Sequence, residues 1–203
     1  MRIAVTGSHS LGKSTVVNDW VQAHPEFLRE EEPYRALGLH GPYEIRFREE
    51  STRLQNGIQL YYSLSRVFLH SGAERPVIFD RAPIDYIAYS QYTADCGTTD
   101  IDQAFVDSMI PAVRESLAHL DILAFVPKSD DWPVDLEQDG IRPVDPGYRD
   151  QVDAIFKSIY RDGRYGLMSR RGGPRVIELV GPPAQRLLQI EQAGLALGRH
   201  AAP

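Results

Sequence analysis

The sequence predicts an α/β fold in which helices alternate with the short strands of a parallel sheet. A short apolar run with β-branched residues at 2–6 leads through a glycine loop into an amphipathic helical pattern that starts directly after Lys13. Farther along, apolar runs at 77–79 and 121–126 each lie between helical patterns. There are no internal repeats and no linker, so the 203 residues predict one domain.

The loop after the first strand has the spacing of a phosphate-binding loop. Gly7 and Gly12 can adopt backbone angles closed to other residues, so successive amides can curl round a phosphate at the positive end of the helix. Lys13 then supplies a mobile charge for the β and γ phosphates, and the Ser14 hydroxyl is placed to ligate Mg²⁺. The alternative is a chance glycine turn before a helix whose Lys and Ser serve solubility. The predicted nucleotide-binding residues are Gly7, Ser8, His9, Ser10, Leu11, Gly12, Lys13, Ser14 and Thr15.

The composition and net charge limit the classes of partner that this protein is expected to bind. Hydrophobic residues make up 42% and charged residues 25%, as in ordinary globular proteins. The formal net charge of -6 argues against a broad nucleic-acid surface, although local cations can still bind a small anion. The single cysteine, Cys96, excludes an intramolecular disulfide, and no apolar run approaches the roughly 20 residues that span a bilayer. We therefore expect a cytoplasmic protein with neither nucleic-acid nor membrane partners; a homodimer stays open.

Glu32 is the candidate catalytic base. A short second strand is predicted within 26–31, and it ends in three adjacent glutamates, which usually form a solvated face; Glu30 is interpreted in that way. Glu32 differs because Pro33 fixes the backbone beside it and Arg35 is close enough to pair with it. A carboxylate at a strand end beside the phosphate loop could accept the proton of a substrate hydroxyl, with Arg35 as a further substrate contact.

A long helix is predicted from about 43 to 71. Gln55 and Gln59 lie one turn apart, close to its apolar face, which suits amides that read the hydrogen-bonding edge of a ligand. Simple exposure of both is the alternative. Most of its apolar positions are expected in the core: Phe47, Leu54, Ile58, Tyr61, Tyr62, Leu64, Val67 and Phe68.

The buried strand at 77–79 ends in two charged residues. Ligands gather at the carboxyl ends of parallel strands, so Asp80 is suited to hold Mg²⁺ through water and Arg81 to pair with a phosphate or with the catalytic carboxylate. Structural ion pairing is the rival explanation. Pro83 suits the first turn of a helix, and Asp85 follows where a carboxylate caps free amides, so capping and substrate binding by Asp85 both stay open.

Three tyrosines follow at a spacing of three residues. Tyr86, Tyr89 and Tyr92 could line a pocket for an aromatic or sugar group, although such stripes more often belong to the core. Tyr89 is kept as a candidate substrate contact. A polar loop at 96–100 and a helix over 102–119 are predicted next.

A lid is predicted where the chain leaves the strand at 121–126. The following stretch is irregular, acidic and proline-punctuated, far longer than a median connection. We therefore expect one domain over 1–203 with a lid at about 127–147. Arg142 is the cation expected to close over the transferring phosphoryl group, and the alternatives are Arg149 and Lys128.

The remaining elements have clear local signals. Asp145 followed by proline predicts a helix through about Tyr160. A last strand is expected at 175–180, and Gly181 with two prolines turns the chain into a final helix to about Leu197.

Several motifs together resemble a known family. They are Gly-Ser-His-Ser-Leu-Gly-Lys-Ser-Thr (7–15), Glu-Pro-Tyr-Arg (32–35) and Phe-Asp-Arg-Ala-Pro-Ile-Asp-Tyr (79–86), followed by Asp-Gly-Ile-Arg (139–142). In this order the chain resembles the P-loop kinase-like AAA-type proteins that include nicotinamide riboside kinase domains. More distantly it is similar to deoxynucleoside kinases. The resemblance covers roughly residues 1–190.

The resemblance implies a P-loop NTPase fold, a five-stranded parallel sheet in the order 2-3-1-4-5 wrapped by helices. By position, Glu32 matches the carboxylate that activates the acceptor hydroxyl, and Asp80 with Arg81 matches the acidic-Arg pair after the third strand. Gln59 falls about where those kinases place a base-recognising glutamine, and Arg142 about where they place a lid arginine.

Three positions depart from the family pattern. Ser10 stands where many kinase loops have glycine, and Leu11 where a small or hydroxyl residue is usual. Ala82 replaces the serine or threonine common after Asp-Arg, which removes one polar contact.

The predicted function is an ATP- and Mg²⁺-dependent phosphotransferase that acts on the hydroxyl of a small acceptor, with a nucleoside-like compound favoured. Glu32 would take the proton, and Lys13, Arg81 and Arg142 would stabilise the moving phosphoryl group. One alternative is a nucleoside monophosphate-type kinase, whose cations could be Arg35, Arg46, Arg48 and Arg53. Another is a nucleotide-binding regulatory ATPase, which would leave Glu32 without a role.

Overall fold

Five parallel strands form one sheet at the centre of the chain. The computed structural model describes residues 1–38, 46–135, 145–168 and 172–200. The strand order is β2-β3-β1-β4-β5, which confirms the predicted α/β class and P-loop NTPase topology. The strands are β1 (Arg2–Thr6), β2 (Leu28–Glu30), β3 (Val77–Asp80), β4 (Ile122–Phe125) and β5 (Arg175–Glu178).

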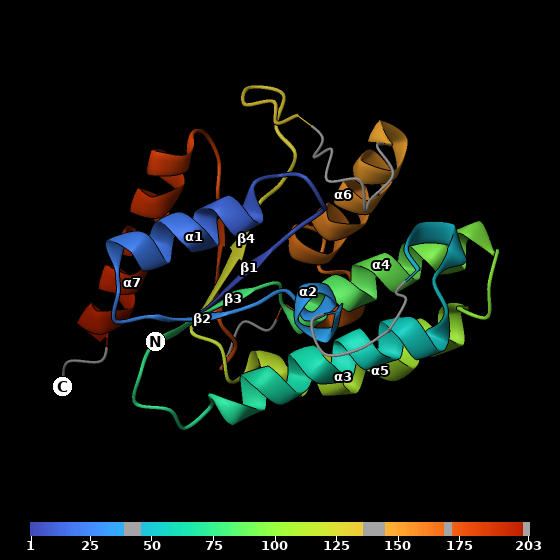
Figure 1. Cartoon of the computed structure of the whole chain (residues 1–203), viewed down its shortest axis with the longest axis horizontal. Helices are drawn as coiled ribbons and strands as arrows, with labels where there is room; N and C mark the ends of the chain where they lie inside the picture. The colour runs from blue at the N-terminus through green and yellow to red at the C-terminus, as the bar shows by residue number, and fades with distance from the viewer. Residues whose placement is uncertain (39–45, 136–144, 169–171, 201–203) are drawn as a thin grey trace.

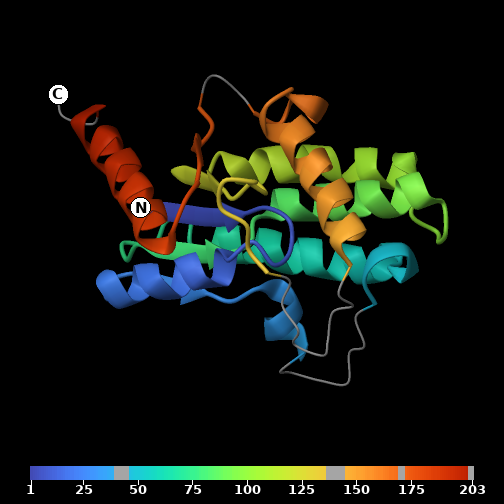
Figure 2. The ribbon, with the colours of Figure 1, turned by 90° about the horizontal axis from the view of Figure 1, so that it is seen from above.

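Helices cover both faces of the sheet (Figure 1). One face packs against α1 and α7, and the other against α3, α4, α5 and α6. Figure 2 shows α3, α4 and α5 side by side beneath the crossing helix α6. The helices are α1 (Lys13–Ala23), α2 (Pro33–Gly38), α3 (Arg53–Leu69), α4 (Pro83–Cys96), α5 (Gln103–Leu117), α6 (Pro146–Tyr160) and α7 (Pro183–His200).

The three central strands, β3, β1 and β4, are largely apolar and buried because helices cover both sides of the sheet there. In β1, Ile3 and Val5 pack toward α1 and α7, whereas Ala4 between them packs toward the other helical layer. Alternate residues of a strand point to opposite faces, so the side chains of one short strand contribute to the hydrophobic core on each side of the sheet. Over the described ranges, no helix combines the length and the apolar character that crossing a bilayer requires.

The long helix begins later than the sequence predicts. The residues described before α3 form an extended segment and one 3-10 turn, Arg48–Glu50, rather than a helix from about 43. α3 starts after Thr52, whose side chain accepts from the Gln55 backbone while the Gln55 side chain accepts from the Thr52 backbone. This capping box fixes the start of the helix.

The side chains that this region buries also differ in part from the prediction. Of the eight apolar positions predicted there, Leu64 and Val67 are buried, together with Leu60. Three others lie on the solvent face, namely Leu54, Tyr61 and Phe68. The remaining three are half-buried: Phe47, Ile58 and Tyr62.

The first part of the predicted lid packs against α6. Residues 127–135 are described, and 136–144, which include the predicted lid cation Arg142, lie outside the described residues. The Lys128 backbone donates to Asp153 at 2.8 Å, and its ammonium group lies 2.6 Å from Asp150. α6 begins at the predicted point, because Asp145 caps it through the Tyr148 amide.

Candidate functional site

The glycine loop lies at the carboxyl end of β1, directly before α1. Gly7 has φ +133°, and a Cβ added there would lie 2.5 Å from the Val126 carbonyl oxygen. Gly12, with φ +80°, caps α1 in the left-handed region. The loop thus runs so close to the end of β4 that only glycine fits at its first position.

Lys13 turns back into this loop. Its ammonium group donates to the Ser8 carbonyl oxygen, and the side chain is buried. Burial, with Arg81 as the next cause, lowers the pKa of Lys13 well below its ordinary value. A bound phosphate would place a negative charge beside this buried ammonium group and stabilise its charged form.

Asp80 is a buried carboxylate at the end of β3. It is 1% exposed, and in the described part of the chain neither oxygen has a hydrogen-bond partner. Arg29 Nη2 approaches one oxygen at 3.7 Å. Burial raises the pKa of Asp80, while Arg81 and the nearby Ser14 hydroxyl oppose that rise.

These groups fit a magnesium ion. Mg²⁺ usually takes one or two protein oxygens and completes its shell with water and phosphate. The orphaned Asp80 carboxylate and the Ser14 hydroxyl at the start of α1 provide such a pair. Among the described residues, no group of three or more His, Cys, Asp or Glu side chains is placed to hold a metal ion.

Arg81 joins the phosphate loop to Glu32. Its Nε donates to Glu32 Oε1 at 3.0 Å, and its Nη1 donates to the Gly7 carbonyl oxygen at 2.9 Å. Arg35 also approaches Glu32, with 3.4 Å between its Nε and Oε2. Arg81 holds this position with φ +101°, a strained value for a residue with a side chain.

Asp85 lies behind Arg81 rather than at a cavity. It is fully buried, accepts a hydrogen bond from the Thr6 hydroxyl, and lies 3.6 Å from Arg81 Nη1. Burial raises the pKa of Asp85 to about 6, and Arg81 opposes that shift. Asp85 does not line the cavity beside Glu32, and α4 has no side-chain cap hydrogen bond at Ala82, so both predicted roles stay predictions.

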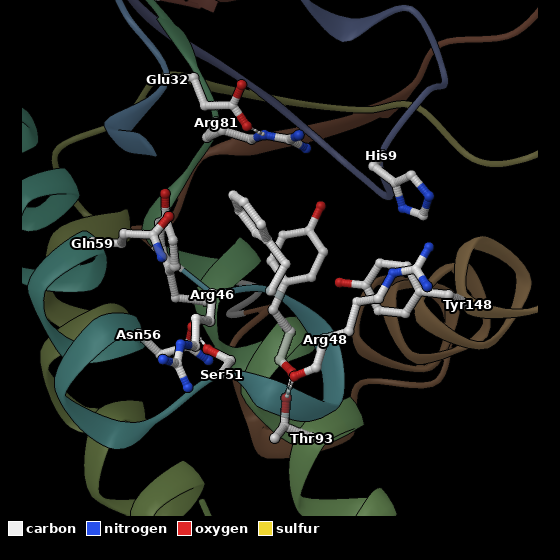
Figure 3. A pocket seen from close by; sticks show the side chains of 13 residues that line it. His9, Glu32, Arg46, Arg48, Ser51, Asn56, Gln59, Arg81, Thr93 and Tyr148 are labelled. Carbon is white, nitrogen blue, oxygen red and sulfur yellow. Dashed lines mark hydrogen bonds and ion pairs between the residues drawn. The ribbon is translucent and has the colours of Figure 1, made fainter. Parts of the chain in front are cut away.

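A cavity opens beside Glu32 and Arg81 (Figure 3). Gln59, Asn56 and Ser51 stand on one side of it, and His9 and Tyr148 on the other. His9 of the phosphate loop and Glu32 therefore both face this cavity. It is lined by His9, Glu32, Arg46, Phe47, Arg48, Ser51, Asn56, Gln59, Arg81, Tyr86, Tyr89, Thr93 and Tyr148.

Tyr148 is held between elements that are distant in the sequence. Its ring stacks on His9, with 4.8 Å between the centroids, and Arg48 lies over it at 4.9 Å. Arg48 is anchored in turn by Asp145 at 3.1 Å. The α6 start, the phosphate loop and the segment before α3 thus meet on one wall.

A second hollow borders the loop at Leu11. Arg186 borders it and ties two segments together, since it donates to the carbonyl oxygens of Leu11 and Gly181 at 2.7 and 2.9 Å. Its other lining residues are Leu11, Pro127, Lys128, Ser129, Asp130, Trp132, Pro133, Val134 and Arg149.

The structure brings several of the predicted site residues to one cavity. Glu32, Gln59, Arg81 and Tyr89 line the cavity, as does His9 of the phosphate loop. The other described residues of the predicted site do not line it. Arg35 reaches it only by pairing with Glu32, Gln55 caps α3, and Thr15 is exposed on α1.

Sequence reasoning missed Ser51, Asn56, Thr93 and Tyr148. One available signal was the Thr-x-x-Gln capping box at 52–55. It places the helix start at the cavity and sets Asn56 and Gln59, three residues apart, on one helical face.

The comparisons with known proteins agree with the fold. A family model described as an AAA domain matches residues 2–173. No curated protein matches the chain.

Solved structures share the architecture at low identity. NadR protein in complex with NR has a TM-score of 0.65 at 16% identity, over 96% of this chain and 50% of that one. NadR in complex with NAD and AMP-PNP gives 0.63 at 14% identity, over 96% and 48%. The chain thus spans about half of the NadR chains that it matches.

A third similar structure is deoxyadenosine kinase from M. mycoides with bound dATP. It has a TM-score of 0.62 at 14% identity, over 95% of this chain and 98% of that one. The sheet order, the phosphate loop and the family match lead to one conclusion: the chain belongs to this AAA-domain family and has the P-loop kinase-like fold.

Proposed function

We propose that this protein is a kinase that transfers a phosphoryl group from Mg²⁺-ATP to the hydroxyl of a small nucleoside-like acceptor. The observation that carries the proposal is the shared cavity of Glu32 and His9. An alcohol bound there would have a carboxylate on one side and the phosphate loop on the other. That is the arrangement which a direct transfer between two bound substrates needs.

The donor would occupy the loop and the second hollow. The phosphates would lie against the amides after Gly7 and beside Lys13, and the base would lie in the hollow bordered by Arg186 and Trp132. Similar folds solved with AMP-PNP and with dATP support a nucleoside triphosphate donor.

Each charged group then has a defined task. Glu32 would accept the acceptor proton, and Lys13 and Arg81 would stabilise charge on the moving phosphoryl group. Asp80 and Ser14 would hold the magnesium ion, which supplies charge neutralisation on the donor phosphates when bound. Arg142 is the lid cation proposed to complete this set.

The acceptor cavity supports a ring-bearing substrate. Aromatic rings from Phe47, Tyr86 and Tyr89 contribute to its lining, and the amides of Asn56 and Gln59 provide polar groups on one wall. Rings with polar edges combine apolar faces with hydrogen-bonding groups, which matches such a lining. The similar structures named for NR and for deoxyadenosine also favour this class.

A monophosphate acceptor is the second candidate. Arg46 and Arg48 line the cavity and could bind its phosphate. The other two arginines of the predicted cluster do not line the cavity. Arg53 pairs with Asp102 at 2.6 Å, and Arg35 pairs with Glu32.

The test is a screen for acceptor-dependent ADP formation. Purified protein with Mg²⁺-ATP is offered nucleosides, simple sugars and nucleoside monophosphates in separate reactions. Our proposal expects ADP formation to depend on a nucleoside. Activity with monophosphates alone would favour the second candidate, and slow hydrolysis that no acceptor stimulates would favour a regulatory ATPase.

A further inference from the structure

Arg29 lies beside the orphaned carboxylate of Asp80. It is the middle residue of β2 and is paired in register with Ile78 of β3, whose side chain packs toward α1. Alternate residues of a strand point to the same face, so Arg29 and Asp80, two residues after Ile78, both point toward α1. The Arg29 Nη2 atom lies 3.7 Å from Asp80 Oδ2, which is an ion-pair distance but longer than a hydrogen bond.

Three contacts hold the guanidinium at that distance. Nη1 donates to Asn18 Oδ1 of α1 at 2.6 Å, and Nη2 lies 3.0 and 2.9 Å from the two carboxylate oxygens of Glu31. Glu31 is fixed in turn, because its Oε1 also accepts the Glu32 backbone N–H at 2.9 Å. Arg29 therefore places a positive charge beside Asp80 without occupying the lone pairs of its carboxylate.

This charge has two opposite effects at Asp80. The carboxylate is 1% exposed, and a neighbouring cation lowers the cost of burying its negative charge. The same cation repels a divalent ion that binds the carboxylate, and Lys13 and Arg81, which also act electrostatically on Asp80, add to the positive surroundings. A unit charge about 6 Å from a divalent ion changes the affinity for that ion about tenfold even with the dielectric screening of water.

Resting on the magnesium site of the proposed kinase, we infer that Arg29 is a positioning residue that sets the metal affinity of Asp80. It makes the carboxylate a weak ligand for free Mg²⁺ and leaves the lone pairs open for Mg²⁺ that arrives on the donor phosphates. The negative charge of a triphosphate outweighs that of one guanidinium, so metal and donor bind together. Glu31 and Asn18 hold Arg29 at the distance that this requires.

Metal titrations without nucleotide test this inference. The probe is Mn²⁺, which suits the same oxygen ligands as Mg²⁺ and is detected by electron paramagnetic resonance. At pH 8 and low ionic strength, we expect Arg29→Met to bind Mn²⁺ at least about tenfold more tightly than the natural chain does. Arg29→Gln, which keeps a hydrogen-bond donor, should show a gain in the same direction. Adding Asp80→Asn to Arg29→Met should abolish the gain.

Two further variants separate the position of the charge from its presence. Glu31→Gln should bind Mn²⁺ no more tightly than the natural chain, because it frees Arg29 to pair directly with Asp80, and adding Arg29→Met should restore tight binding. The matched control is Arg75→Met, which removes an exposed arginine before the amino end of β3. It should leave the Mn²⁺ affinity unchanged.

The titrations contain neither donor nor acceptor, so they are independent of the kinase assay. Tighter Mn²⁺ binding by Arg29→Met in a protein that transfers no phosphoryl group would uphold the inference and contradict the kinase. Equal affinities of Arg29→Met and the natural chain, including no detectable binding by either, would overturn the inference. Weaker binding by Arg29→Met would also overturn it.

Discussion

Arg81 is the residue at which the two halves of the site meet. Its guanidinium donates hydrogen bonds to Glu32 and to the Gly7 carbonyl oxygen. The proposed catalytic carboxylate and the phosphate loop are therefore fixed relative to each other. The positive φ of Arg81 is a cost that these contacts offset. The planar guanidinium makes these contacts from two different nitrogens in a fixed geometry, which the single nitrogen of a lysine ammonium group does not reproduce.

Arg81→Lys should therefore separate chemistry from binding. We expect kcat for phosphotransfer to fall about 100-fold, while the donor Kd changes less than about threefold, because Lys13 and the loop amides remain. Steady-state kinetics with a calorimetric donor titration measures both. If only the donor affinity falls and kcat is unchanged, Arg81 contributes to donor binding and not to the chemical step.

Asp85 gives a pH prediction for stability. Its pKa rises from 3.8 to about 6 in the folded protein through burial, so the folded state holds this proton more tightly than the unfolded chain. The resulting stabilisation is fully present below the pKa that Asp85 has in the unfolded chain, and it is lost as the pH rises through about 6.

Asp85→Asn removes that ionisation and keeps an oxygen for the Thr6 hydroxyl. Relative to the natural chain, the free energy of unfolding of the variant should rise by about 1 to 3 kcal/mol between about pH 4 and pH 7. Urea unfolding across that window measures it. If the free energy of unfolding of the variant instead falls relative to the natural chain as the pH rises, the attraction of Asp85 to Arg81 outweighs the cost of burying its charge.

Single residues at strand ends could be predicted from the sequence. Glu32, Asp80 and Arg81 come after short apolar runs, and the carboxyl ends of parallel strands meet at one edge of a sheet. Ser51 and Tyr148 could not be found in this way. They reach the cavity through packing between segments almost 100 residues apart, which no local pattern encodes.

Among the elements, the phosphate loop is the most constrained. Its two glycines differ in their surroundings, since a Cβ on Gly7 would meet the Val126 backbone at 2.5 Å and a Cβ on Gly12 would meet the end of the Arg186 side chain at 3.3 Å. Backbone cannot move aside as a flexible side chain can.

Alanine at the two positions should therefore have unequal effects. Gly7→Ala should lower the free energy of unfolding by about 2 kcal/mol or more and abolish donor binding. Gly12→Ala should cost about 1 kcal/mol, mainly for its positive φ. Equal losses in thermal and urea unfolding would show that the Val126 contact does not shape the loop.

The start of α3 shows where periodicity misleads. Aromatic residues before the helix continue its apolar spacing, so the pattern alone predicted a start near residue 43. The capping box at Thr52 and Gln55 begins the helix later, and the preceding residues can bring Phe47 and Arg48 into the cavity wall. Capping chemistry is stronger evidence for a boundary than periodicity is.

At the scale of the whole molecule, the parallel sheet explains why the site forms. β1, β2 and β3 lie side by side in the sheet and end at the same edge, which gathers the phosphate loop, Glu32 and Asp80 with Arg81. The α/β class followed from residues alone. The strand order did not, because it depends on crossovers between distant segments, and the family resemblance supplied it.

The central claim is that Glu32 accepts the proton of the acceptor, and one substitution tests it most directly. Glu32→Gln keeps the shape of the side chain and removes its basicity. A matched control is Glu178→Gln, which changes a carboxylate at the end of β5 that pairs only with Arg161 in the described structure.

Phosphotransfer kinetics and ATP binding are measured together for the two variants. We predict that Glu32→Gln lowers kcat by about 100-fold or more with ATP affinity intact, and that Glu178→Gln retains full activity. Phosphotransfer by Glu32→Gln at the rate of the control would contradict the account.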